Sequence, residues 1–252
     1  MESINPKLFD IVIPIGPNDI NIYKKQIEYT KKNIIGYRNI YLIIFDARIK
    51  VDGCITISES IFPFSKTDVE KYHGPTMRCG WYLQQLFKLY SGIVIPDILD
   101  KYLVIDSDTL FLKPTTFIEN NKMLFNISTE YHEPYFVHMY MLHKSLLKQI
   151  SYASGICHHM IFQTDCIRQL FELIENEHHD KFYNIFLKLI QPCNYEHSGS
   201  SEYEIYFNYM IKYHSDKIDI RILKWDTIDN IENLPEYEKG NNQYITSHWY
   251  CR

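Results

Sequence analysis

The sequence lacks several features that define well-known classes of protein. It has no Lys/Arg-rich stripe, and its formal net charge is −5, so nucleic acid is not expected as a partner. No apolar run is long enough for a membrane span. The stretch MESINPKLFD at the N-terminus has neither the basic nor the apolar region of a secretory signal. We therefore expect a cytoplasmic protein with no membrane span.

Cysteine pairs with metal-site or redox spacing are also missing. The six cysteines are scattered and form no CxxC pair, which argues against zinc-ribbon and thioredoxin-like sites. We expect reduced thiols, most of them in the core. No internal repeat or low-complexity linker divides the chain, and 252 residues suit one large α/β domain.

What the sequence does contain is an alternation of apolar strands and helices. Strands are predicted at 8–16, 39–47 and 54–59, and a helix capped by Asp19 runs to about residue 32 between the first two. This succession predicts a parallel sheet with a right-handed crossover. The remaining predicted elements are a helix at 78–91, a strand ending before Asp106, a strand or loop at 154–163, a helix at 164–178, a loop at 191–201, a helix at 202–214 and a strand at 218–225.

The stretch YLVIDSDTLFLKP places Asp106 and Asp108 directly after a β-branched apolar strand, where open α/β sheets deliver ligand-binding residues. Two such carboxylates can share an oxygen-preferring divalent cation and leave positions open for a diphosphate. Alternatively, Asp106 is the nucleophile and Asp108 the acid/base of an aspartyl phosphatase, because the string also resembles the start of haloacid-dehalogenase phosphatases. A third interpretation is that the two aspartates only end a strand.

The helix predicted at 78–91 has a polar face opposite its apolar arc. Arg78, Gln85 and Lys88 belong to this polar face. It is either the solvent-facing side of the helix or a stripe that holds phosphate or sugar, and both interpretations stay open.

The helix predicted at 202–214 begins with two glutamates. Ser201 and Glu204 have the spacing of a capping box, in which Glu204 reaches back to the start of the helix, so Glu204 has a structural explanation. Glu202 is freer, and after a flexible loop it could accept the proton of an acceptor hydroxyl in an inverting enzyme. A retaining enzyme needs no such base, and these glutamates would then bind the acceptor.

In combination, these segments resemble nucleotide-diphospho-sugar glycosyltransferases of the GT-A fold. The similar motifs are IVIPIG, LIIFDA, WYLQQLFKLY, DSDTLFLKP, SGICHHMIFQTD, SEYEIYFNY and a late histidine. Their order is similar to a glycosyltransferase-like family of bacteria and large DNA viruses, including viral members that glucosylate collagen. The resemblance implies a single α/β domain over 1–252, with a mostly parallel sheet flanked by helices. A nucleotide-binding half would cover about 1–114, and an acceptor-binding half about 115–252.

The resemblance also implies roles for individual residues. It places Ile13, Pro14, Ile15 and Gly16 against the nucleoside, Asp46 beside uracil, Ser107 against the ribose, Arg78, Gln85 and Lys88 near the diphosphate, His158 and His159 at the sugar or acceptor pocket, and Asp106, Asp108 and His248 on the metal. Adjacent residues of an extended segment point to opposite faces, so only one of the two adjacent histidines is expected to face the site. The glycine pattern that usually neighbours the late histidine is missing, so an ordinary role for His248 stays open.

The partners that the resemblance implies are a UDP-sugar donor, with UDP-glucose as the specific expectation, and Mn²⁺ or Mg²⁺. The acceptor would be a glycan or a collagen-like glycoprotein carrying galactosyl-hydroxylysine. A viral member would act in the host cytoplasm or in association with the virion. The aromatic stretch YHEPYFVHMY would form a homodimer contact, an acceptor groove or part of the core. A non-enzymatic carbohydrate-binding protein is a further alternative.

Overall fold

The computed structural model describes residues 8–248, and its centre is a five-stranded sheet in the order β3-β2-β1-β4-β8. The first four strands are parallel, whereas β8 runs antiparallel to β4. The strands are β1 (Phe9–Ile15), β2 (Tyr37–Ile44), β3 (Ile55–Ser58), β4 (Lys101–Ile105) and β8 (His159–Gln163). The predicted α/β fold with a mostly parallel sheet flanked by helices is confirmed, and the reversed strand β8 was not predicted.

Two helices connect the parallel strands: α1 (Tyr23–Asn33) joins β1 to β2, and α3 (Cys79–Val94) leads into β4. The predicted cap of α1 by Asp19 was wrong. Asp19 ends a short 3-10 turn and accepts a hydrogen bond from the backbone nitrogen of Gly16 at 3.2 Å, whereas α1 begins at Tyr23. The tight end of β1 is thus stabilised locally, before the helix starts.

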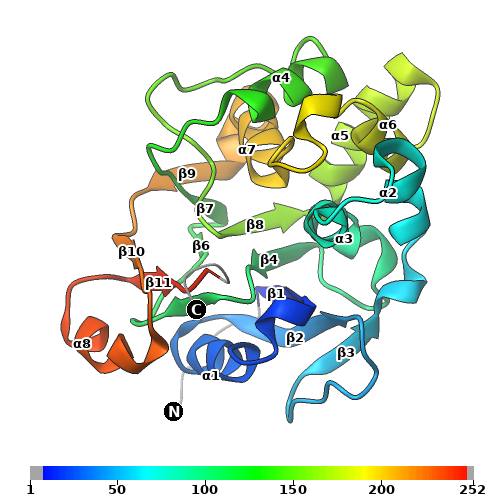
Figure 1. Cartoon of the computed structure of the whole chain (residues 1–252). Coiled ribbons are helices and arrows are strands. Elements are labelled where there is room, and N and C mark those ends of the chain that lie inside the picture. The colour runs from blue at the N-terminus through cyan, green and yellow to red at the C-terminus, as the bar shows by residue number, and fades with distance from the viewer. Residues whose placement is uncertain (1–7, 249–252) are drawn as a thin grey trace.

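Of the remaining helices of the middle of the chain, α4, α5, α6 and α7 gather beyond β8, toward the top of Figure 1, whereas α2 lies at the right beside α3. Of these, α5 and α7 match the predicted helices, whereas α2, α4 and α6 were not assigned from the sequence. Their bounds are α2 (Lys66–His73), α4 (Glu133–Leu142), α5 (Thr164–His178), α6 (Phe182–Lys188) and α7 (Glu202–Tyr213). Figure 1 shows α1 on the opposite side of the molecule, next to β2.

Two small sheets bring the last part of the chain back to the centre. One contains β10 (Trp225–Thr227), β11 (Tyr244–Thr246) and β5 (Thr109–Phe111), and the other contains β6 (Ile118–Glu119), β7 (Lys122–Asn126) and β9 (Ile218–Arg221). The predicted strand at 218–225 was therefore wrong as one element, because its two ends belong to different sheets. The tail contains α8 (Leu234–Lys239) and β11, which were not assigned from the sequence.

One hydrophobic cluster extends through both predicted halves of the chain. Its members include Ile11 and Leu103 before residue 114, and Phe162 and Phe207 after it. Every residue of β1 is buried, as expected for a strand with paired neighbours on both sides and covered faces. The five described cysteines, Cys54, Cys79, Cys157, Cys166 and Cys193, are free thiols, whereas Cys251 lies outside the described residues.

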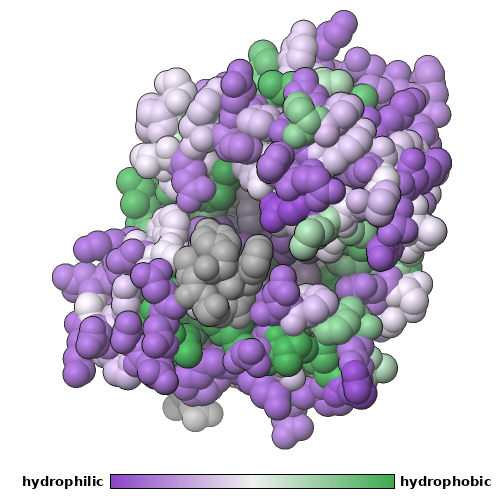
Figure 2. Space-filling view, viewed as in Figure 1, coloured by the Kyte–Doolittle hydropathy of each residue, from purple (hydrophilic) through white to green (hydrophobic). Residues whose placement is uncertain are grey.

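On the face shown in Figure 2, hydrophilic side chains predominate among the described residues, and hydrophobic ones form small separate groups. This view offers no broad apolar surface for a subunit contact, so the expected homodimer stays a prediction. Among residues 8–248, no helix combines the length and apolar character needed to span a bilayer.

Candidate functional site

The carboxyl ends of three adjacent parallel strands carry predicted site residues. Gly16 follows β1, Asp46 follows β2, and Asp106 follows β4, with β1 between the other two. This edge of an open α/β sheet is where ligands bind in such folds. The turn after β4 is fixed from both sides, because the Asp106 nitrogen donates to the His158 carbonyl at 2.9 Å and the Thr109 nitrogen donates to the Asp106 carbonyl at 3.0 Å.

Strand β11 places the late histidine beside this turn. Thr246 pairs with Thr109, and the Ser247 nitrogen donates to the Asp108 carbonyl at 2.9 Å. His248 Nδ1 consequently lies 3.4 Å from Asp108 Oδ2. Burial opposes a charge on the His248 imidazole, but the carboxylate of Asp108 outweighs it and raises the pKa. The tertiary structure thus joins two of the three predicted metal ligands.

Behind the turn, Lys88 is buried between two carboxylates. Its Nζ lies 2.5 Å from Asp106 Oδ1 and 2.6 Å from Glu202 Oε1, and the lysine is only 2% exposed. Burial alone disfavours the ammonium, but the two carboxylates outweigh it and raise the pKa of Lys88. Lys88 therefore stays charged, as a buried cation must when it is paired with carboxylates.

Glu202 was predicted to be the freer of the two glutamates, and this was wrong. It is 3% exposed and bound to Lys88. Burial raises the pKa of its carboxyl, Lys88 opposes this, and the nearby Asp106 adds to it. Glu202 therefore belongs to a buried charge cluster rather than to an open acceptor surface.

Tyr203 is a member of the same cluster that sequence reasoning missed. Its hydroxyl donates to Asp106 Oδ1 at 2.9 Å, and Lys88 Nζ lies 4.5 Å from the centre of its ring. Burial, followed by the charge of Asp106, raises the pKa of Tyr203 well above its ordinary value, so the hydroxyl remains a donor. Tyr203 lies in the segment SEYEIYFNY, but the resemblance gave this residue no role, and one tyrosine among 21 does not stand out by its type.

The polar face of α3 is neither a solvent-facing side nor an open stripe. Arg78 Nη2 donates to Ser198 Oγ at 2.9 Å, and Ser200 Oγ donates to Gln85 Oε1 at 3.1 Å. Lys88 continues this row to the first residue of α7. Gln85 and Lys88 are buried, so the prediction that they lie on a solvent-facing side of the helix was wrong. The row holds in place the segment that leads into α7.

Glu204 has a structural role, as its position in the capping box suggested, but its carboxylate contacts other residues than the cap. Ser201 Oγ accepts from the Glu204 nitrogen at 3.2 Å, which is one half of the capping box. The Glu204 carboxylate does not turn back to the cap. Instead it accepts from the Ser154 hydroxyl and from Asn208 Nδ2, the latter at 2.9 Å. Burial raises the pKa of Glu204.

Only one of the adjacent histidines faces the site, although the extended segment assumed for them was wrong, because His158 has a φ of 61° and β8 begins at His159. The ring of His158 lies 5.2 Å from that of His248 and 4.8 Å from that of Trp225, so His158 faces the site. The ring of His159 packs against Phe111 at 5.0 Å inside the core. Burial lowers the pKa of both histidines, that of His159 well below its usual range, and both stay neutral.

The residues expected around the nucleoside lie along this same edge. Pro14 and Ile15 are buried in the last part of β1, and Gly16 is half-buried just beyond them. Asp46 forms a two-point ion pair with Arg48, whose hydrogen bonds lower the pKa of Asp46 to about 2. In the turn after β4, Ser107 is buried.

The metal ligands expected from the sequence do not form a self-contained metal centre. Among residues 8–248, no group of three His, Cys, Asp or Glu side chains is arranged to hold a metal ion. The donor set still suits Mn²⁺ or Mg²⁺, because such cations take one or two protein carboxylates and complete their coordination with substrate phosphates and water. Within residues 8–248, both donors to the Asp106 carboxylate reach Oδ1 rather than Oδ2.

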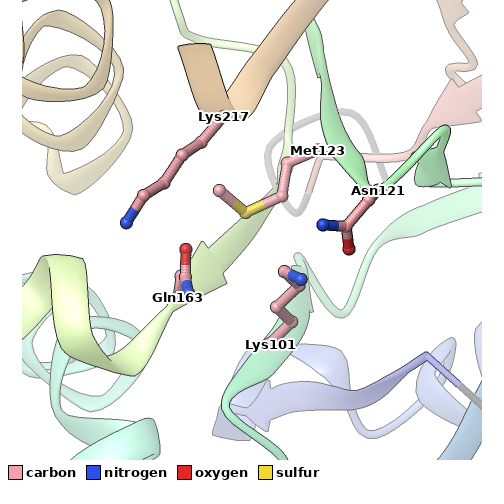
Figure 3. A pocket seen from close by; sticks show the side chains of 5 residues that line it. All are labelled: Lys101, Asn121, Met123, Gln163 and Lys217. Atoms are coloured by element: carbon pink, nitrogen blue, oxygen red, sulfur yellow. The ribbon is translucent and has the colours of Figure 1, made fainter. Parts of the chain in front are cut away.

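The molecule also has a pocket that contains none of the polar residues described above. It has a cavity volume of about 150 Å³ and is lined by Lys101, Asn121, Met123, Gln163 and Lys217, whose side chains converge in Figure 3. Lys101 begins β4 and Gln163 ends the antiparallel β8. The pocket therefore lies at the end of β4 opposite Asp106. Because the chemically meaningful groups lie at the carboxyl edge, we place the candidate site there.

Comparison with known proteins gives a family. The chain belongs to the family of unknown function DUF6492, whose model matches residues 45–248. No curated protein sequence matches it. Mouse xyloside xylosyltransferase 1, in its apo form, is similar with 9% identity and a TM-score of 0.46, over 97% of this chain and 99% of that one. An active-site mutant of LgtC is similar with 12% identity and a TM-score of 0.47, over 94% and 86% of the two chains. With both TM-scores below 0.5, neither likeness bears on activity.

Proposed function

We propose that the protein is a divalent-cation-dependent glycosyltransferase of the GT-A type, which transfers a sugar from a UDP-sugar to a glycan or glycoprotein. One observation carries this proposal. The turn containing Asp106 and Asp108 lies at the carboxyl edge of a mostly parallel sheet, and His248 is brought against it from the far end of the chain.

In this proposal the cation is Mn²⁺ or Mg²⁺, held by Asp106, Asp108 and His248. When bound, it would neutralise the charge of the leaving nucleoside diphosphate. Ser107 would contact the ribose, and Gly16 would let the nucleoside approach the end of β1. The remaining predicted contacts, including Asp46 at uracil, belong to the same proposal.

The positions of the two glutamates bear on the choice of mechanism. Glu202 is bound to Lys88, and Glu204 to Ser154 and Asn208, and both are buried. A general base must be within hydrogen-bond reach of the acceptor hydroxyl. Neither glutamate is placed for this task, which favours a retaining reaction in which the leaving phosphate takes the proton.

The finer expectation is transfer of glucose from UDP-glucose to galactosyl-hydroxylysine of a collagen-like protein. It rests on the resemblance of the sequence to the mimivirus collagen galactosylhydroxylysyl glucosyltransferase. Action in a host cytoplasm or with a virion depends on that same resemblance. Two exposed aromatic residues, Tyr131 just before α4 and Tyr140 within it, would then contact either the acceptor or a second copy of the chain.

The first test is a UDP-release screen over common UDP-sugars with Mn²⁺, using water and then glycosylated collagen peptides as acceptors. We expect Asp106→Ala to lower UDP release by about 100-fold or more, since even the outer partners of metal ligands are worth 10–100-fold. The fold should survive, because Lys88 keeps Glu202 as a partner. The exposed Asp229→Ala is the matched control. Full activity in Asp106→Ala would contradict the metal assignment.

The same screen separates the alternatives. An aspartyl phosphatase would hydrolyse small phosphate esters with Mg²⁺, would be inhibited by a phosphate mimic that caps Asp106, and would need no nucleotide sugar. A carbohydrate-binding protein would bind glycans with no effect of UDP or Mn²⁺.

A further inference from the structure

We propose that Tyr203 and Lys88 are positioning residues that occupy one oxygen of Asp106, Oδ1, and that they thereby make the cation site selective for Mn²⁺ and Mg²⁺ over Ca²⁺. This inference rests on the proposed function, because it assumes that Asp106 binds a cation. It adds a role for a tyrosine to which the resemblance assigned none.

The first step is the occupancy of the two carboxylate oxygens. Oδ1 of Asp106 accepts from Lys88 Nζ at 2.5 Å and from the Tyr203 hydroxyl at 2.9 Å. Each carboxylate oxygen has about two lone-pair sites, so these donors fill Oδ1. Within residues 8–248, both donors reach Oδ1 rather than Oδ2. The two oxygens of Asp106 are therefore not equivalent to an incoming cation.

The second step is that Lys88 and Tyr203 are held in position as donors to Asp106. Lys88 is 2% exposed and Tyr203 is 4% exposed, so water has little access to replace either donor. Glu202 holds the ammonium from the other side. The backbone at Tyr203 is itself tightly packed, because a Cβ on Gly155 would lie 3.0 Å from the Tyr203 carbonyl oxygen. The start of α7 is therefore closely packed against Gly155.

The third step is the chemistry of the cations. Ca²⁺ takes six to eight oxygens at 2.3–2.6 Å and often uses both oxygens of one carboxylate, whereas Mg²⁺ requires six ligands in an octahedron. Mn²⁺ also suits an octahedral oxygen site. If only one oxygen of the aspartate is available, Ca²⁺ loses one of the oxygen ligands that it would otherwise take from a bidentate carboxylate. Mg²⁺ and Mn²⁺ bind with one oxygen of the carboxylate and lose no ligand. The ammonium behind Oδ1 also repels any cation that approaches from that side.

The test measures cation binding rather than turnover. Free Mn²⁺ is followed by its EPR signal as it binds protein in the presence of UDP, and Ca²⁺ is then added as a competitor. Tyr203→Phe removes only the hydroxyl and partly frees Oδ1. We expect the ratio of Ca²⁺ to Mn²⁺ affinity to rise about tenfold, the scale of one lost hydrogen bond. Tyr209→Phe, a buried tyrosine farther along α7, should leave the ratio unchanged.

Each result decides between the two proposals. If the wild-type protein binds no Mn²⁺ with UDP, the cation-dependent function itself fails. If the wild-type protein binds Mn²⁺ but Tyr203→Phe keeps the wild-type ratio, or loses affinity for both ions equally, the positioning role is overturned and the function stands. Should Tyr203→Phe not fold, the Lys88→Met/Glu202→Gln double variant frees Oδ1 from the other side, and it must show the same rise in Ca²⁺ competition.

Discussion

Lys88 shows how a single residue can escape interpretation from the sequence. Helical periodicity assigns it to the polar face of α3, which suggests solvent or an anionic ligand. Its two partners, Asp106 and Glu202, come from the turn after β4 and from the first residue of α7, and only folding brings them to it. A fully buried lysine is retained because the carboxylates offset the loss of its hydration, and each carboxylate in turn depends on the ammonium.

This dependence predicts strongly non-additive effects of mutation on stability. Lys88→Met leaves Asp106 and Glu202 without their cation and should lower the free energy of unfolding by about 3–5 kcal/mol. Glu202→Gln should cost less, because Lys88 keeps Asp106. We expect the double variant Lys88→Met/Glu202→Gln to be more stable than Lys88→Met alone, as measured by urea unfolding. Costs that simply add would show that the three groups do not act as one cluster.

At the scale of elements, the segment at 191–201 illustrates a loop that is placed by a helix. Its sequence suggests only a flexible connection. In the structure, the Tyr82 hydroxyl of α3 donates to the Asn194 carbonyl at 2.6 Å, and a Cβ on Gly199 would lie 3.1 Å from that same hydroxyl. The segment therefore lies directly against α3, and this contact places Glu202 at Lys88.

A second contact between elements predicts a pH dependence of stability. His138 of α4 is buried, and its Nε2 lies 2.9 Å from the Phe186 carbonyl of α6. Burial lowers the pKa of His138 to about 4, against about 6.5 in an unfolded chain. Protonation therefore favours the unfolded state. The contribution is fully present above pH 6.5 and is lost as the pH falls toward 4, by about 3 kcal/mol.

The measurement for His138 is urea unfolding at a series of pH values from 7.5 to 4. His138→Gln keeps a side-chain donor for the Phe186 carbonyl but cannot titrate, so its stability should fall less steeply below pH 6.5. The exposed His197→Gln serves as the control. A slope for His138→Gln equal to that of the wild-type protein would contradict the buried neutral histidine.

At the scale of the whole molecule, the candidate site joins parts of the chain that are far apart in sequence. The turn after β4 supplies Asp106 and Asp108, α7 supplies Tyr203, and the segment just after β11 supplies His248. A ligand that binds this edge would therefore link the central sheet to the end of the described chain and stabilise the native state as a whole.

We accordingly expect UDP and Mn²⁺ together to raise the melting temperature more than the sum of their separate effects. Near 100 times the dissociation constant the gain is about 2.7 kcal/mol, or roughly 5–10 °C for a chain of this size. His248→Ala should remove most of the Mn²⁺-dependent part and leave the effect of UDP alone. An unchanged Mn²⁺ titration in that variant would argue against His248 as a ligand.

Local patterns in the sequence determined the strands at the carboxyl edge, the helices α3, α5 and α7, and the acidic turn after β4. These features depend on apolar periodicity, caps and the sterics of neighbouring residues, which act over a few positions. The direction of β8 was not predictable from them, because an antiparallel and a parallel strand have similar apolar runs.

The resemblance grouped His248 with the two aspartates, but only the tertiary structure decided which side chains surround Lys88 and how His248 reaches Asp108. Lys88, Glu202 and Tyr203 form one cluster with Asp106, and His248 reaches Asp108 because β11 pairs with β5. Each contact depends on a charge or hydroxyl that would be costly to bury alone, so its partner must come from another element. No spacing in the sequence encodes such a partner, because it is selected by packing across the whole fold.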